Sequence, residues 1–194
     1  MYLLVTEQVR AHVSADFFAN SSFMKRLDVV FANFYFDALS AASRPCVNVP
    51  TAWRPLFSSR RDPEIHEIQF ALAGMTVHIR HDLPLALIRT CEENQLDPRR
   101  GTVHADYQKV DQILDSIEQS VRESFESGQI LTDDKDHAAL FDRLGSWSII
   151  DSRDQAWETA MHLWECRHVA LAEHVLLEAL AHTVAAASDA LLHA

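Results

Sequence analysis

The chain has 194 residues, the usual length of one domain, and 48% of them are hydrophobic. This composition excludes a mainly disordered chain, because enough apolar surface is present to bury a core. Only 4 glycines and 6 prolines occur, which favours helices over a β-sandwich or barrel with its many turns. With 17 Lys and Arg against 28 Asp and Glu, the net charge of −11 argues against a nucleic-acid partner or an anionic membrane surface.

The cysteines favour a reducing compartment, and we expect a cytoplasmic protein. Cys46, Cys91 and Cys166 are odd in number and form no CxxC pair, so neither a disulfide framework nor a cysteine zinc site is indicated. The first residues carry no signal-peptide pattern. No uncharged apolar run approaches the roughly 18 residues of a membrane span, so no membrane contact is expected.

Helical periodicity and chain breakers predict an all-α fold with seven or eight helices in a single domain over residues 1–194. The helices are expected over about 6–19, 22–42, 62–81, 83–94, 106–126, 133–144, 152–166 and 169–192. Three prolines between them make 44–61 an extended connection, with a short helical turn near 53–57.

The helix near 64–81 is expected to lie at the centre of the bundle. Asp62-Pro63-Glu64 has the pattern of a helix start, with a cap, a proline and an acid in order. The run Phe70-Ala71-Leu72-Ala73-Gly74-Met75 is apolar on nearly every face, which is typical of a buried helix. We therefore expect Leu72, Met75 and Ile79 to be inaccessible.

His78 and Asp82 form the strongest local motif, because side chains four residues apart share one helix face. An imidazole and a carboxylate placed so can act as an acid/base pair or bind one divalent cation such as zinc. The alternative is structural, with His78 hydrogen-bonded in the core and Asp82 capping the next helix. Pro84 predicts a break near Asp82, where the carboxylate would accept the Leu85 N–H and also hold the His78 ring.

Two further groups are candidates for the same pocket. His104 lies at a loop edge before the long fifth helix and is a candidate base or third metal ligand, with Asp106 as ligand-binding residue or simple N-cap. Asp37 follows an aromatic run on a helix expected to be largely buried, where a carboxylate is a catalytic group or part of an ion pair. Tyr35 and Trp53 are candidate aromatic walls of the pocket.

These residues also carry a resemblance over nearly the whole chain. The segments 27–39, 50–57 and 69–87, with His104, Asp106 and the tryptophan motifs near 147, 157 and 164, resemble a bacterial family of unknown function (domain of unknown function 5995). The resemblance implies an all-helical domain and no established activity. A more distant likeness, to the zinc-dependent phospholipase C and single-strand nuclease group, rests on His78, Asp82 and Pro84 and implies a metal site.

The leading expectation is an intracellular helical enzyme that acts on a small molecule by metal-assisted hydrolysis or acid/base catalysis. Its site would combine residues from three segments, namely Asp37, His78, Asp82, His104 and Asp106. A metal-free binding or cyclisation scaffold, with Tyr35 and Trp53 lining an apolar pocket, is the alternative. The third alternative is a structural protein in which His78, Asp82 and Asp37 satisfy one another.

Overall fold

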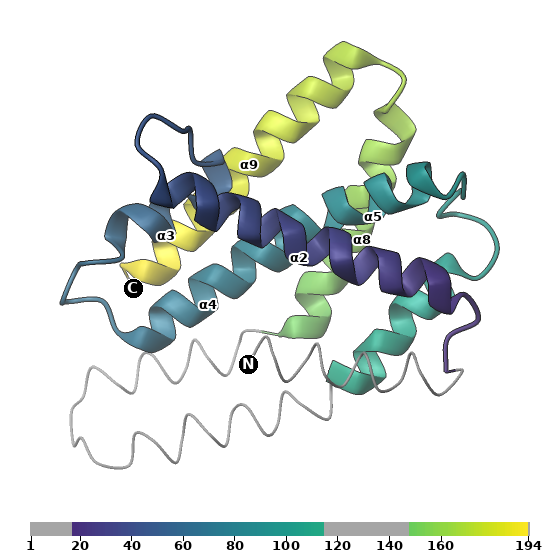
Figure 1. Cartoon of the computed structure of the whole chain (residues 1–194), viewed down its shortest axis with the longest axis horizontal. Coiled ribbons are helices and arrows are strands. Elements are labelled where there is room, and N and C mark those ends of the chain that lie inside the picture. Colours follow the sequence, from purple (N-terminus) through teal and green to yellow (C-terminus); the bar gives the residue numbers. More distant parts are fainter. Residues whose placement is uncertain (1–16, 115–147, 194) are drawn as a thin grey trace. The chain divides into compact units, whose positions relative to one another are not determined.

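The computed structural model describes residues 17–114 and 148–193, and every regular element in these ranges is a helix, which confirms the all-α prediction. Figure 1 shows the elements in chain order: α2 (Ser21–Ser43), η1 (Thr51–Trp53), α3 (Arg54–Ser59), α4 (Glu67–Val77), η2 (His78–Asp82), α5 (Leu83–Glu93), a helix over 103–114, α8 (Ile149–Cys166) and α9 (Ala170–Leu192). The helix expected over 133–144 and most of that over 6–19 lie outside the described residues. Residues 17–20 are not helical.

The chain divides into two compact units. One comprises Met1–Lys25 with Arg99–Asp151, and the other comprises Arg26–Pro98 with Ser152–Ala194. We refer to them as the terminal unit and the main unit and describe each by itself. The single domain expected over residues 1–194 stays a prediction.

In the terminal unit, a buried carboxylate anchors the start of α2. The oxygens of Asp106 accept the backbone N–H groups of Ala19 at 2.9 Å and Asn20 at 2.7 Å. Asn20 then caps α2 by accepting the N–H of Phe23 at 3.0 Å. Lys109 Nζ lies 3.2 Å from Asp106 Oδ1 and offsets its charge. Asp106 therefore satisfies N–H groups just before a neighbouring helix.

The expectation that Asp106 caps its own helix is wrong. Its backbone N–H already donates to the carbonyl of Thr102 at 2.9 Å, so the helix begins at residue 103 and Asp106 lies inside its first turns.

In the main unit, α4 begins at Glu67, later than the Asp62-Pro63-Glu64 pattern predicts. Asp62 instead accepts the N–H of Glu64 at 3.0 Å and closes a turn outside the helix. The helix starts after His66, whose N–H donates to Gln69 Oε1 at 2.8 Å as in a capping box. The amide nitrogen of Gln69 donates at 3.0 Å to the Leu192 carbonyl, one of the acceptors left open at the end of α9.

The expected burial of this helix is confirmed only in part. Leu72, Ala73 and Val77 are buried, as the apolar run predicts. Met75 and Ile79 are half-buried, so the expectation that both are inaccessible is wrong. The burial follows one face of the helix, because residues 68, 69, 72, 73, 76 and 77 recur at helical spacing.

The break predicted at Asp82 does not occur. α4 continues through η2, a single π turn in which the N–H of Leu83 donates to the carbonyl of His78, five residues back. Helical dihedrals persist through this turn, with φ −80° and ψ −34° at Asp82 itself. A wider turn at this point accommodates Pro84, whose ring would clash with the Arg80 carbonyl in a regular α-helix. Asp82 makes no cap hydrogen bond, so its expected bond to the Leu85 N–H is absent.

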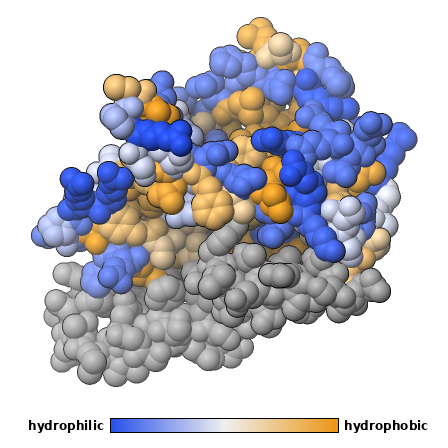
Figure 2. All heavy atoms as spheres, in the orientation of Figure 1, coloured by the Kyte–Doolittle hydropathy of each residue, from blue (hydrophilic) through white to orange (hydrophobic). Residues whose placement is uncertain are grey.

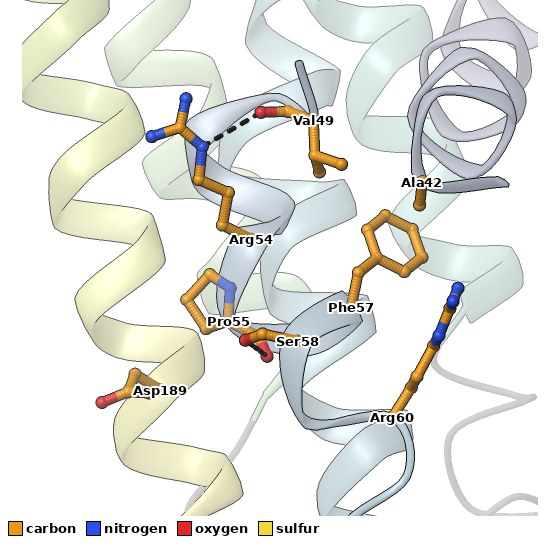
Figure 3. Close-up of a pocket in the computed structure, with 8 residues that line it drawn as sticks. All are labelled: Ala42, Val49, Arg54, Pro55, Phe57, Ser58, Arg60 and Asp189. Carbon is orange, nitrogen blue, oxygen red and sulfur yellow. Dashed lines mark hydrogen bonds between the residues drawn. The ribbon is translucent and has the colours of Figure 1, made fainter. Parts of the chain in front are cut away.

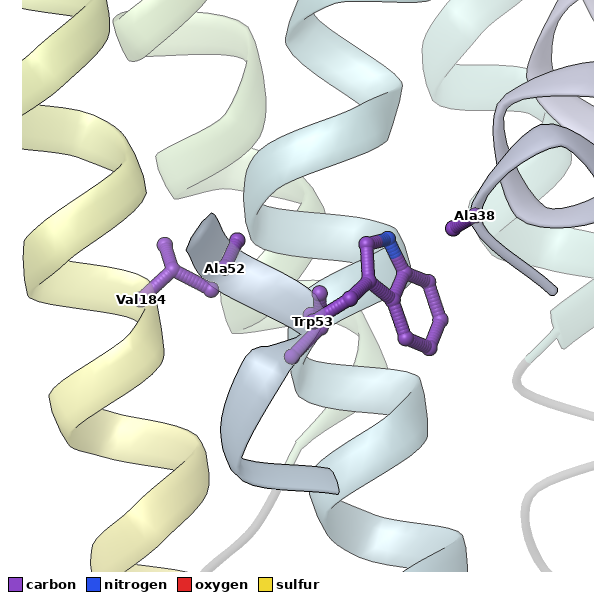
Figure 4. Close-up of a cluster of buried hydrophobic side chains, with 5 residues drawn as sticks. Ala38, Ala52, Trp53 and Val184 are labelled. Atoms are coloured by element: carbon purple, nitrogen blue, oxygen red, sulfur yellow. The ribbon is translucent and has the colours of Figure 1, made fainter. Parts of the chain in front are cut away.

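The connection expected to be extended carries η1 and α3, and it packs on α4 and α9. Ala52 and Trp53 are buried and pack with Ala38 of α2 and Val184 of α9 (Figure 4). Figure 4 shows the Trp53 indole extending from η1 toward the helix that carries Ala38. This packing fixes the position of the indole, which matters for the site described below.

α9 is the one described helix that is long and apolar enough to cross a membrane, by length and composition alone. Only 17% of its most apolar 18-residue window is buried. Orange spheres at the top of Figure 2 mark hydrophobic side chains near its start, where Val169, Leu171 and Val175 are exposed. The helix also packs on α4. Length and composition alone do not test localisation, so the expected cytoplasmic location and absence of membrane contact stay predictions.

Candidate functional site

The candidate site is built around the carboxylate of Asp82, which is 1% exposed. Its Oδ2 lies 3.0 Å from Nδ1 of His78, and its Oδ1 lies 2.7 Å from Nδ1 of His81. The indole N–H of Trp53 donates to Oδ2 at 3.1 Å and lies 3.4 Å from Oδ1. One buried carboxylate therefore joins two imidazoles and an indole, and we call these four residues the Asp82 network.

Each member is positioned by the backbone around it. η2 carries His78, His81 and Asp82 within one π turn, and π turns of this kind are frequent at functional sites. Trp53 ends the short helix η1, which begins after Pro50 and is buried against α9 and α4. The proline-rich connection therefore brings the indole to a carboxylate 29 residues further along the chain.

Aromatic rings from α2 enclose the imidazole of His78, which is 8% exposed. Phe31 is stacked on it, with ring centroids 3.7 Å apart and planes 5° apart. Tyr35 lies one helical turn further along α2, with its ring 5.8 Å from His78 and 5.5 Å from Trp53. The ring is held on one face by apolar packing and at one nitrogen by Asp82, so its orientation is well defined.

This arrangement determines which ring nitrogen of each histidine carries the proton. An ionised carboxylate accepts hydrogen bonds, so Asp82 assigns the Nδ1–H tautomer to His78 and to His81 when the rings are neutral. The lone pair of each neutral ring is then on Nε2, the atom that can accept a proton or a hydrogen bond. In His78 this atom is buried, so His81 is the more accessible of the two rings. A carboxylate that orients an imidazole in this way is the arrangement used in acid/base catalysis.

The structure brings together four of the residues selected from the sequence, His78, Asp82, Tyr35 and Trp53. Asp37 does not join them. It is exposed, so the expectation that it is buried is wrong, and it lies two residues beyond Tyr35, which places it on nearly the opposite face of α2.

His104 and Asp106 belong to the terminal unit, whereas the Asp82 network belongs to the main unit. His104 is exposed, and the carboxylate of Asp106 is engaged by two backbone N–H groups and Lys109. Their roles as base, metal ligand or ligand-binding residue stay predictions.

The donor set does not fit the expected zinc site. Within residues 17–114 and 148–193, no three His, Cys, Asp or Glu side chains are arranged to hold a metal ion. In the network the Asp82 oxygens face Nδ1–H and indole N–H groups, an arrangement that orients imidazoles and leaves the carboxylate poorly placed as a ligand. No chemistry proposed below passes through a metal.

Two features of the network were not found from the sequence. The pattern does not predict His81, because α-helical spacing places it on a different face from His78, whereas its Nδ1 contacts the adjacent residue Asp82. Trp53 was selected as an apolar wall, whereas its indole N–H also makes a polar contact. A tryptophan that is 1% exposed generally needs an acceptor for that N–H, and this was the available signal.

The nearest helix, α5, adds no nucleophile. Burial, together with the nearby charges of Asp97 and Glu92, raises the pKa of the Cys91 thiol to about 12, so the thiol is protonated at neutral pH. At the end of the helix, Arg26 makes a two-pronged contact with Glu93 at 2.6 and 3.0 Å, which lowers the pKa of that carboxyl group. Both features belong to the scaffold.

Residues 1–194 match a protein family described as a family of unknown function (DUF5995). No curated protein and no solved structure matches this chain. The likeness to the phospholipase C and nuclease group therefore gains no support, and the chemistry has to be argued from the Asp82 network itself.

Proposed function

We propose that this chain, which belongs to the family of unknown function DUF5995, is an enzyme that transfers protons on a small molecule. His81 is the acid/base group, and Asp82 is the positioning residue that fixes its ring and that of His78, whose Nε2 is buried. The observation that carries the proposal is the pair of contacts from one buried carboxylate to two Nδ1 atoms.

The energetic argument starts from the cost of this arrangement. A carboxylate that is 1% exposed is expensive to bury unless it is well hydrogen-bonded, and an apolar residue of similar size generally serves a core at least as well. Two histidines aimed at the same carboxylate increase the number of buried polar groups. An arrangement of this kind is typical of a site where proton transfer is needed.

Access to the network is provided by His81. Its side chain retains 12% of its surface, whereas that of Asp82 retains 2%. The aromatic neighbours Phe31 and Tyr35 are half-buried and border the His78 ring. A small, partly aromatic or apolar substrate suits such surroundings better than a polymer does.

A structural role is the second candidate, and a specific observation favours it. Asp82 accepts from three donors, and together they tie the π turn to η1 across the core. In this alternative the network stabilises a helix that contains Pro84 and performs no chemistry. The two candidates differ in what removal of His81 does to the rate of catalysis, because only the catalytic role makes that rate depend on the His81 ring.

Hydrolysis of p-nitrophenyl acetate tests the proposal, since an accessible and oriented imidazole accelerates this reaction. We compare wild type with His81→Gln, His78→Gln and the control His162→Gln, which alters an exposed histidine on α8. His81→Gln is expected to lower the rate by at least ~10-fold, because a positioned acid/base group contributes ~10²–10⁴-fold. His78→Gln is expected to have a smaller effect, because the Nε2 atom of His78 is buried. His162→Gln is expected to match wild type.

Equal rates for wild type and His81→Gln, with both proteins folded by circular dichroism, would contradict the proposal and favour the structural role. His81→Gln is the decisive variant because Nε2 of His78 is buried, which leaves His81 as the ring that can reach a substrate.

A further inference from the structure

A second feature of the main unit is independent of the Asp82 network. An open pocket of about 610 Å³ lies between the end of α2, the η1–α3 connection and α9 (Figure 3). Its apolar floor includes Val49 and Phe57, and two arginines, Arg54 and Arg60, border it. The size is in the range of sites that take small organic molecules.

The charge around this pocket is opposite to that of the chain. The segment 44–61 carries four arginines and no Asp or Glu, whereas the whole chain has a net charge of −11. The acidic residue at the pocket border is Asp189 of α9. Its Oδ1 lies 3.4 Å from Nδ1 of His193, so this carboxylate already has a partner outside the pocket lining. A concentration of guanidinium groups in an acidic protein favours an anionic ligand.

The two arginines are held differently. Arg54 Nε donates to the Val49 carbonyl at 3.1 Å, and Figure 3 shows its guanidinium on the opposite side of the pocket from that of Arg60. Arg60 makes no ion pair within residues 17–114 and 148–193, and it is exposed. Figure 3 shows its side chain extending beside the Phe57 ring, on the side of the pocket near Ala42. Arg60 is therefore the group best placed to meet an incoming anion.

Phe57 supplies the apolar half of the site. Its ring is stacked on the buried Trp53, with centroids 5.6 Å apart and planes 23° apart, so the floor is fixed by the core beneath it. Figure 3 shows the ring between Ala42 and Arg60. A ligand that rests an apolar body on Phe57 and Val49 would place a charged end within reach of a guanidinium.

We propose that this pocket binds an amphipathic organic anion, whose carboxylate or sulfonate group contacts Arg60 while its apolar body covers Phe57. Guanidinium groups bind such oxyanions through paired hydrogen bonds, which a lysine would not supply. The proposal does not rest on the proton-transfer function, because no member of the Asp82 network borders the pocket.

Titration with 8-anilinonaphthalene-1-sulfonate, followed by its fluorescence in about 0.15 M salt, tests this site. We expect saturable binding with one site per chain. Arg60→Gln is expected to weaken binding about tenfold or more, since a hydrogen bond to a charged group contributes about 1.5–3 kcal/mol. The matched control is Arg61→Gln, which removes the same charge one residue away from a side chain that does not border the pocket, and it is expected to bind like wild type.

Displacement then identifies the ligand class. Octanoate is expected to displace the probe at a concentration at least ~10-fold lower than either octanol or inorganic phosphate requires, because only octanoate has both an apolar body and an anionic end. Non-saturable fluorescence, or equal weakening by Arg60→Gln and Arg61→Gln, would overturn the pocket assignment. Displacement by octanol as effective as that by octanoate would overturn the anionic half of the proposal, and equal displacement by phosphate would overturn the apolar half.

Discussion

At the scale of single residues, Asp82 is the centre of the network on which the proposed chemistry rests. Its carboxylate is almost fully buried and accepts from His78, His81 and Trp53. A residue that only capped a helix would tolerate replacement by asparagine with little cost. Since Asp82 is no cap and serves three donors, the same replacement has a different expected outcome.

We predict that Asp82→Ala lowers the free energy of unfolding by about 3–5 kcal/mol, because three buried donors lose their acceptor. Asp82→Asn keeps the shape but turns an N–H group toward the donors, and a loss of about 1–3 kcal/mol is expected. Urea denaturation measures both. The control is Asp37→Asn on the exposed face of α2, expected to stay within about 0.5 kcal/mol of wild type. An Asp82→Asn protein as stable as the control would show that the network contributes little to folding.

At the scale of elements, the sequence predicts the existence of the helices better than their ends. The boundaries of α2, α5 and α9 agree with the expected ranges within two residues, because apolar periodicity extends through each of them. The start of α4 was misplaced because Asp62-Pro63 closes a turn with the same residues that begin a helix. The continuation through Asp82 was missed because nothing in the local pattern distinguishes a π turn from a break before Pro84.

The turn that ends α5 contains a residue, Gln95, with a strained backbone conformation. Asn94 is the C-cap of the helix, and Gln95 follows with φ +55°, a left-handed conformation that glycine usually adopts at this position. The N–H of Leu96 donates to the Cys91 carbonyl at 2.9 Å and that of Gln95 to the Glu92 carbonyl at 3.1 Å, which is the Schellman pattern.

Gln95→Gly is therefore expected to raise the free energy of unfolding by up to ~1 kcal/mol, because glycine adopts this conformation without the steric cost paid by other residues. Thermal or urea denaturation measures the change. Glu92→Gly, inside the same helix, serves as the reference and is expected to be destabilising by about 1 kcal/mol. If both substitutions destabilise alike, the left-handed turn does not carry the strain assigned to it.

At the scale of the whole molecule, the predictable part is the class of fold and one of its polar motifs. The pair His78 and Asp82 was found because a spacing of four residues places both on one helix face, and the hydrogen bond between them confirms that they meet. The expectation that Asp37 shares this site is wrong. Tyr35 lies on the face of α2 that contacts His78, and Asp37, two residues further on, lies on nearly the opposite face and is exposed. The N–H of Trp53 meets a carboxylate 29 residues further along the chain, which periodicity does not encode, whereas His81 contacts the adjacent residue, a pairing that a pattern of helix faces does not reveal.

The central claim is that Asp82 holds His78 and His81 as two oriented imidazoles with Nδ1 toward the carboxylate, which leaves Nε2 of His81 to accept a proton. Long-range proton–nitrogen NMR of histidine-labelled protein, at about pH 8.5 where ordinary imidazoles are neutral, reports the tautomer of each ring directly. The account predicts the Nδ1–H tautomer for His78 and His81 in wild type, and its loss in Asp82→Asn. The Nε2–H tautomer at both rings in wild type, unchanged by Asp82→Asn, would contradict the account.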